Sequence, residues 1–424
     1  MSSDTNNAPE PKLDLANWAN LPNKLMLSGI ILLIGLIFTP EKFGYTYLTG
    51  FMFFLSLTLG SMFLVILHHL FDAYWMVPIR RFLEHIACLT PWLGVLFLPI
   101  LIFMAFGHVD IYPWMSADPE TDHALHVKKV MFNKGVFYVV SILLFAVWWW
   151  LSNSLRSHSL AQDESGSAAC THVLRRRAAA GIFIFAVTLT LGVIYWMKSL
   201  EYQWFSTMYG VYYFAGSVWT TLATTYLLAA ILKRTGHLAP VIRETTFKDI
   251  GTLFFAFTVF YAYIHFSQYF LIWNAAIPEE TFWYVKRENG IWWSVGMLII
   301  FGHFFLPFLS LLRIDIKKNI SLSLYYSLIL AGWAWLMHYA DMTYNIMPVP
   351  YPKGTLGGEG YGLWDFVLSI SALAFMGGFL AKVFLRNFIS HPPYPQKDPR
   401  IAEAMGVYVE LESEVEDKAN ASKA

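Results

Sequence analysis

Long apolar runs alternate with short polar connections along almost the whole chain. A helix needs about 20 residues to cross the hydrocarbon core of a bilayer, and ten runs approach or exceed that length. They lie near residues 24–39, 46–71, 87–107, 135–152, 178–197, 208–232, 250–274, 291–312, 321–345 and 362–386. The pattern predicts an all-α polytopic membrane protein whose transmembrane domain covers residues 24–386.

The two ends of the chain differ from this middle part. Residues 1–23 are polar and lack the basic region and short apolar core of a cleaved signal peptide. Residues 387–424 begin with a proline-rich stretch, which predicts extended backbone, and end in an acidic run. We expect both segments to be cytoplasmic tails.

Composition supports the membrane class, because 57% of the residues are hydrophobic and only 14% are charged. The chain has two cysteines, Cys88 and Cys170, and no CxxC or CxxCH motif. The sequence therefore encodes no iron–sulfur cluster, zinc site or covalently attached haem, and we expect no bound metal. Any redox centre would be non-covalent or would belong to a partner protein, and no nucleic-acid partner is expected.

Most of the Lys and Arg residues between spans lie in the connections that follow the second, fourth, sixth and eighth spans. The positive-inside rule then places both termini in the cytoplasm. In a bacterium this corresponds to a multi-pass protein of the inner membrane.

Parts of the second and sixth spans look alike, which suggests an internal repeat. Each span carries a Gly-Ser pair and is followed by a Pro-containing phrase that ends in arginine: Gly60-Ser61 with 78–81 (PIRR), and Gly216-Ser217 with 240–243 (PVIR). The pattern predicts two parallel four-helix bundles, spans two to five and six to nine, with the first and tenth spans as flanking helices. Chance similarity among apolar helices is the alternative.

Polar side chains inside the seventh and ninth spans are the candidate functional residues. Thr258, Tyr261, His265 and Gln268 share one helical face at spacings of three and four. The ninth span repeats the arrangement with His338, Asp341 and Asn345, and the eighth carries His303 at depth. A carboxylate one turn from an imidazole can relay a proton or hold an oxygen atom of a ligand.

The second span ends with His68, His69 and Asp72 at the predicted cytoplasmic side. Solvation beside lipid headgroups would equally explain these residues. For His265 and His303 the alternatives are hydrogen bonds to neighbouring helices or a haem held between the two imidazoles.

Three phrases carry a specific resemblance. They are FSQYFLIW at 266–273 followed by IPEET at 277–281, LEYQWFSTMYG at 200–210, and HHL at 68–70 followed by IRR at 79–81. Together they resemble the NrfD-like superfamily of polysulfide reductase membrane subunits. Within it, the sequence is most similar to the ActF-type membrane subunit of alternative complex III, a quinol:cytochrome c oxidoreductase. The resemblance covers residues 25–386.

The resemblance implies a respiratory membrane subunit without an electron carrier of its own. Its partners would be a sister NrfD-like ActC-type subunit, a periplasmic iron–sulfur subunit, multihaem and monohaem c-type cytochromes, small membrane subunits and lipids. Such a subunit supports the membrane core and is thought to carry protons. The expected proton path contains seven residues: His69, Asp72, His265, Gln268, His303, His338 and Asp341.

Two other functions are compatible with the same residues. The chain would bind quinol itself if Tyr263 and His265, or His338 and Asp341, accept the hydroxyl protons. A secondary transporter is the third reading, although it would favour inverted repeats and helices broken by Gly or Pro at matching places.

Overall fold

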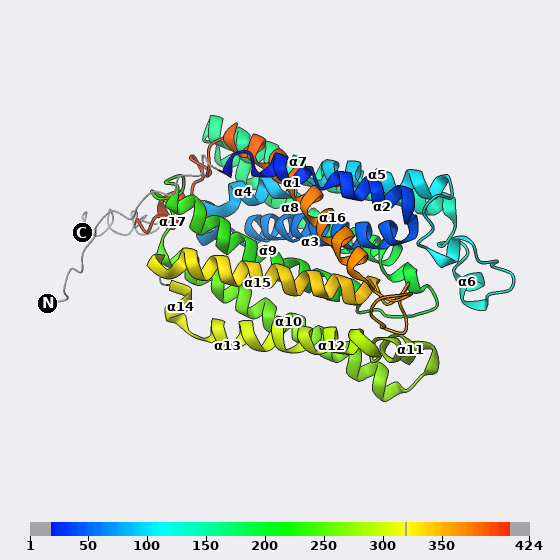
Figure 1. Cartoon of the computed structure of the whole chain (residues 1–424). Helices are drawn as coiled ribbons and strands as arrows, with labels where there is room; N and C mark the ends of the chain where they lie inside the picture. The colour runs from blue at the N-terminus through cyan, green and yellow to red at the C-terminus, as the bar shows by residue number, and fades with distance from the viewer. Residues whose placement is uncertain (1–17, 319, 408–424) are drawn as a thin grey trace, which may run out of the picture.

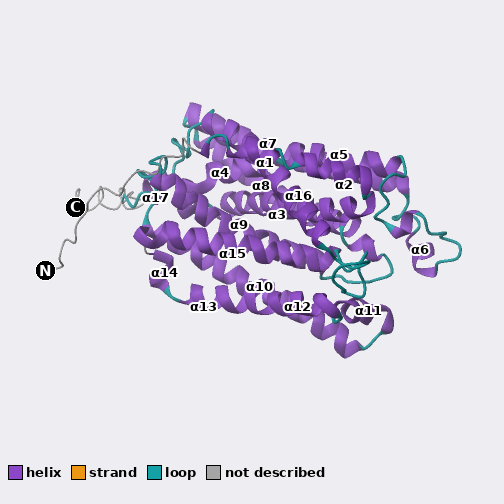
Figure 2. Ribbon diagram, viewed as in Figure 1, coloured by secondary structure: helices purple, strands orange, loops and turns teal. Residues whose placement is uncertain are grey.

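A computed structural model describes residues 18–318 and 320–407, without the side chains of residues 318–324. Within this part of the chain the regular elements are helices, and nine of them are long and apolar enough to cross a membrane (Figure 2). The predicted class, an all-α polytopic membrane protein, is confirmed.

Helices occupy all ten predicted positions. The first is divided into α1 (Leu21–Met26) and α2 (Gly29–Phe38). The next four are α3 (Pro40–Phe71), α4 (Val77–Ala87) continued by α5 (Thr90–Ala105), α7 (Lys134–Ser165) and α8 (Ala168–Trp196). The remaining ones are α9 (Tyr209–Arg234), α10 (Glu244–Ala275), α12 (Gly290–Leu298) continued by η5 (Ile299–Phe305) and α13 (Leu306–Leu312), α15 (Ile320–Ile346) and α16 (Leu363–Ile389).

Short helices lie in the connections between these spans. They are η2 (Tyr74–Met76), η3 (Pro113–Met115), α6 (His123–Lys128), η4 (Lys198–Glu201), α11 (Pro278–Arg287), α14 (Ile314–Lys318) and α17 (Ile401–Ala404). Figure 1 shows α17 and α14 at one end of the molecule and α6 and α11 at the other. We call these the α17 end and the α11 end.

The long helices group as the repeat predicted. Helices α3, α4–α5, α7 and α8 pack together, and so do α9, α10, α12–α13 and α15. The two groups meet mainly where α3 lies along α9, while α16 packs on α3 and on the α1–α2 pair (Figure 1). The interface between the groups is therefore built around α3 and α9, the helices that carry the two Gly-Ser pairs.

Gly60 explains how closely α3 and α9 approach. A Cβ atom at this position would lie 2.2 Å from Thr221 Oγ1 and 2.6 Å from the backbone oxygen of Ser217. Only a residue without a side chain permits this separation, and close contact through small residues is how membrane helices associate when lipid offers no hydrophobic driving force. The Ser217 of the second Gly-Ser pair thus faces the glycine of the first.

Some boundaries differ from the prediction. Helix α7 continues well beyond its apolar run to Ser165, because the polar residues that follow contain no helix breaker until Gly166, which ends the helix in a left-handed conformation. Helix α1 begins at Leu21, inside the segment predicted as tail. Residues 390–407 fold back onto the α17 end, whereas the rest of the predicted tails, residues 1–17 and 408–424, lies outside the described chain.

Candidate functional site

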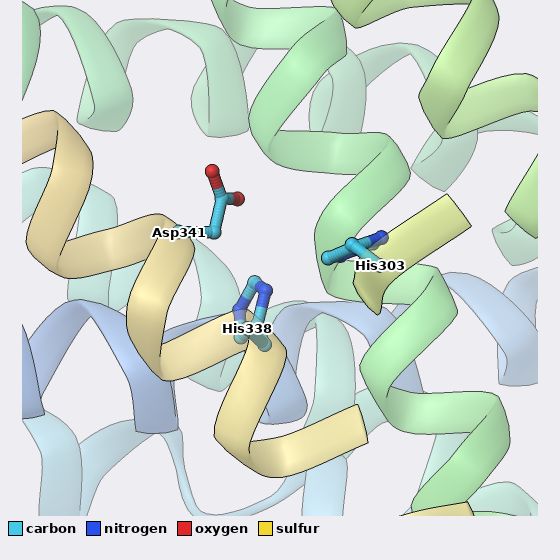
Figure 3. A group of neighbouring side chains, drawn as sticks. All are labelled: His303, His338 and Asp341. Atoms are coloured by element: carbon cyan, nitrogen blue, oxygen red, sulfur yellow. The ribbon is translucent and has the colours of Figure 1, made fainter. Parts of the chain in front are cut away.

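A buried polar cluster lies inside the second helix group, where η5 faces α15. His303, His338 and Asp341 each offer a nitrogen or oxygen atom within 4.8 Å of the others (Figure 3). All three side chains are at most 1% exposed. Sequence spacing predicted the pairing of His338 with Asp341 but not the arrival of His303.

His303 is positioned by an irregular stretch of helix. Residues Ile299–Phe305 form π-helical turns, a local widening that is often found at functional sites. The imidazole lies between the rings of Trp219 and Tyr261, with each pair of centroids 3.7 Å apart. Both ring nitrogens are buried and have no hydrogen-bond partner within the described chain, so the ring is held by stacking alone.

His338 is held from the first helix group. Its Nε2 lies 2.8 Å from Ser56 Oγ on α3, while its Nδ1 is buried without a partner. Gly216 on α9 makes room for this ring, because a Cβ atom there would lie 3.3 Å from His338 Cε1. The second Gly-Ser pair therefore shapes the site directly.

Asp341 is held by a tyrosine and an amide. Tyr212 donates a hydrogen bond to Oδ1, and Asn345 Nδ2 donates to the same oxygen at 3.2 Å. The other oxygen, Oδ2, is buried and has no partner among the described residues. A buried polar atom normally pairs with protein or with ordered water, so the inward-facing atoms of this cluster are suited to hold water or a ligand.

Further tyrosines extend the cluster toward the α11 end. The hydroxyls of Tyr212 and Tyr261 lie 3.1 Å apart, and Tyr209 donates to Asn345 Oδ1 at 2.9 Å. No role was predicted for Tyr209 and Tyr212. The signal was present, because they are spaced three residues apart on one face of α9.

The polar face predicted on α10 points inward, but its residues contact different parts of the protein. Tyr261 belongs to the cluster, whereas Gln268 accepts from Ser206 at 2.8 Å and donates to Tyr284 at 3.1 Å. The His265 ring lies beside Tyr261 and Tyr212, with centroids 5.9 Å and 5.6 Å away. Tyr263 is 62% exposed and turns away from His338 and Asp341 toward the outer surface of α10.

The rings of His265, Tyr261 and His303 lie next to one another. The Tyr261 ring stacks on His303 and is nearly parallel to His265, with only 9° between the planes.

A cavity of about 680 Å³ adjoins the cluster. Tyr261 and His265 form one wall, Arg287 and Tyr344 close another, and apolar residues of α10, α12 and η5 line the rest. Phe266 and Phe305 contribute to the lining and are exposed, so the cavity reaches the outer surface of the helices. Its size and lining suit an amphipathic small molecule.

Arg287 anchors the α11 end of this cavity through a buried ion pair with Glu201, whose atoms lie 2.9 Å apart. Its other N–H groups donate to the backbone oxygens of Trp283, Tyr344 and Asn345. Burial of the Glu201 carboxyl opposes its ionisation, but Arg287 and Lys286 outweigh burial and hold its pKa below the usual range. Four hydrogen bonds thus fix the guanidinium, which supports the wall of the cavity.

The three clustered side chains have the donor types of a metal site. A divalent ion there would be balanced by one carboxylate, one of whose oxygens already accepts two hydrogen bonds. An uncompensated charge is costly away from water, so the same atoms are better suited to water and protons.

The polar residues at the end of α3, which were predicted to lie together on the proton path, occupy different environments. His69 is buried, whereas Asp72 lies at the surface of the α17 end and pairs with Arg175 at 3.0 Å. His68 does not contact this ion pair. Its Nε2 lies 2.7 Å from Nη1 of Arg80 instead. His69 and Asp72 therefore do not form one site.

Comparisons with known proteins leave this geometry without an assigned activity. No model of a known protein family matches the chain, and no curated protein matches it.

Proposed function

We propose that this chain is the ActF-type membrane subunit of a bacterial quinol:cytochrome c oxidoreductase, where it supports the membrane core and conducts protons. The observation that carries the proposal is the buried chain of Ser56, His338, Asp341 and Tyr212, which joins the two helix groups through side chains able to exchange protons. The three resembling phrases support the family.

The partners follow from the chemistry that the chain lacks. Quinol oxidation requires an electron acceptor, and the two cysteines are a buried Cys88 and a separate Cys170. Electrons would pass through iron–sulfur clusters and c-type haems of other subunits, beside a sister NrfD-like subunit. The basic connections at the α17 end favour an orientation in which this end faces the cytoplasm.

The proton route begins near His69 and follows the interface of α3 and α9. Buried hydroxyls lie along it, and those of Ser61 and Thr220 have no partner among the described residues. They would bind water that leads to Ser56 and His338. From Asp341 the hydroxyls of Tyr212 and Tyr261 continue toward His265, while Gln268 and Ser206 lie further toward the α11 end.

The test is proton release per electron in the whole complex, reconstituted in vesicles. Asp341→Asn removes the titrating oxygen but keeps the shape of the side chain, so we expect quinol oxidation to continue with fewer protons transported. Asp315→Asn, which alters an exposed carboxylate paired with Arg313, is the matched control. Unchanged proton transport in Asp341→Asn and in His338→Gln would contradict the proposal.

The cavity beside His265 supports a second candidate, quinol binding by this chain. Tyr261 and His265 would meet one quinol oxygen, and the apolar walls would hold the ring and the start of its tail. Gly296 faces the cavity, and its added Cβ would lie 3.4 Å from Tyr344, so Gly296→Leu would fill the space. A lower rate of quinol oxidation in this variant, with protons per electron unchanged, would favour binding here.

A further inference from the structure

The segment that follows α16 crosses the α17 end of the molecule. We name residues 390–406 the C-terminal strap. It includes α17, which packs against η2 and α4. Its backbone nitrogen at Gln396 donates to Asp163 at the end of α7, at 2.9 Å. A segment predicted as a free tail is therefore attached to the membrane domain.

Asp398 is the central contact of the strap. Its carboxylate is 8% exposed and accepts from Arg80 Nη1 at 2.6 Å. The same Arg80 atom lies 2.7 Å from Nε2 of His68. The row Asp398–Arg80–His68 thus connects the strap with the last turn of α3.

The strap also reaches both helix groups. Arg400 donates to the backbone oxygen of Asp72 at the end of α3. At the far end Gly406, with φ +74°, lies against Arg243, the arginine that ends the Pro-containing phrase after α9. A Cβ atom at Gly406 would meet the Arg243 guanidinium at 1.5 Å, and the positive φ also favours glycine at this position.

Unpaired histidine nitrogens lie beneath the strap. His69 is 5% exposed and His85 is fully buried, yet Nε2 of His69 and both nitrogens of His85 have no partner among the described residues. The His85 ring lies 5.4 Å from that of His391 in the strap. Buried ion pairs occupy the same end of the molecule: Arg80 pairs with Glu84 and Asp398, and Arg81 pairs with Glu84 and Asp163. Buried polar atoms of this kind usually hold ordered water, which predicts a small hydrated chamber.

We propose that the C-terminal strap gates a proton port at the α17 end, and that the Arg80–Asp398 pair is its latch. The inference rests on the proposed proton path and gives that path an entrance. When the latch parts, water reaches His69 and His85, and a hydronium ion can pass its proton to an imidazole nitrogen. When the latch closes, the histidines are separated from the aqueous phase again.

Histidine modification tests the gate without measuring proton transport. The purified complex, containing the full chain, would be treated with diethyl pyrocarbonate, and each histidine would be followed by mass spectrometry. Exposed His172 is the reference, and buried His303 and His338 report whether the fold is intact. Slow modification of His69 and His85 is expected in the unaltered protein.

Asp398→Asn removes the charge that binds Arg80. We expect modification of His69 and His85 to accelerate at least about tenfold, which corresponds to about 1.4 kcal/mol less for opening. Glu403→Gln is the control, because Glu403 lies in the same strap and pairs with Arg400 at the surface. If Asp398→Asn also exposes His303 and His338, Arg400→Gln replaces it, since this change loosens the strap without unpairing Arg80.

Two results would overturn the proposal. The first is modification of His69 and His85 at the same slow rate in the loosened variants, or at the rate of His172 in the unaltered protein. The second is faster modification with no change in the rate of quinol-driven proton uptake, because the strap would then cover a chamber that protons do not use. Failure of the proposed function itself would be distinct, since proton uptake would then also survive Asp341→Asn.

Discussion

The ring of Tyr261 lies against the imidazole of His303, with centroids 3.7 Å apart and planes 18° apart. Trp219 covers the opposite face of the same imidazole at the same separation, and its indole nitrogen donates to Thr258 at 2.9 Å. Three helices, α9, α10 and η5, therefore meet at one side chain. His303 is fixed in place while its nitrogens have no partner among the described residues, which is the arrangement expected of a group that holds water or exchanges protons.

The hydroxyl of Tyr212 should matter more for proton release than the hydroxyl of the adjacent Tyr213. In Tyr212→Phe the buried side chain of Asp341 loses a hydrogen-bond donor, which should lower the free energy of unfolding by about 1–3 kcal/mol, the cost of unpairing a buried polar group. Thermal unfolding measures the loss, and proton release per electron should fall with it.

Tyr213→Phe is the matched control for that change. Tyr213 is equally buried, but its hydroxyl donates to the backbone oxygen of Met52 and does not reach the cluster. Its removal should cost some stability and leave proton release unchanged. Equal proton release in both variants would argue against a role for the Tyr212 hydroxyl.

Gly60→Ala should separate α3 from α9. The new methyl group would meet Thr221 and the backbone of Ser217 below contact distance, and overpacking of this kind typically costs about 1–3 kcal/mol. A lower melting temperature in detergent is expected. Gly332→Ala is the control, because nothing lies within 4 Å of its added Cβ, and its melting temperature should not fall.

The sequence predicted what depends on local spacing. His338, Asp341 and Asn345 fall on one face because the helical period fixes their positions, and α15 presents them together. The same period grouped Tyr261 with Gln268, but it could not tell that one joins the cluster and the other binds Ser206 and Tyr284. Those destinations depend on how far each residue lies along the neighbouring helices.

Contacts between distant segments could not be predicted in this way. His303 reaches the cluster through the π-helical turns of η5, which the apolar run around it does not reveal. Asp398 meets Arg80 across 318 positions of the chain, in a stretch whose prolines and charges are typical of an unattached tail. In both cases tertiary packing decides the position, and the residue type alone indicates only that a polar group is available.

Acid should weaken the α11 end through Glu201. Burial opposes its ionisation, but Arg287 and Lys286 lower its pKa in the folded protein below the ordinary value of about 4.3. The folded state therefore releases this proton more readily than the unfolded state does. The stabilisation is present above about pH 4.3 and is lost as the pH falls through the lower pKa of the folded protein. Melting temperatures measured between pH 6 and pH 3 should show the loss.

Glu201→Gln should flatten this part of the pH profile, although the variant starts less stable because Arg287 stays buried without its partner. Glu120→Gln provides the comparison, since that carboxylate is 72% exposed in its pair with Lys129. A pH profile of Glu201→Gln as steep as that of the unaltered protein would show that another group causes the acid effect.

Lys198 should act in the opposite direction at high pH. Burial, reinforced by the nearby charge of Lys128, lowers its pKa to about 8 in the folded protein, against about 10.4 in an unfolded chain. Between these values the unfolded state binds more protons, so the free energy of unfolding rises with pH. Below about pH 8 the buried charge costs on the order of 3 kcal/mol. Lys198→Met should therefore raise the melting temperature at pH 7 and remove the rise between pH 8 and pH 10.

Lys129→Met, at an exposed site, should do neither. A lower melting temperature for Lys198→Met at pH 7 would mean that the ammonium group has a stabilising partner, and the lysine would then belong to a contact surface and not to the packed connection between α8 and α9.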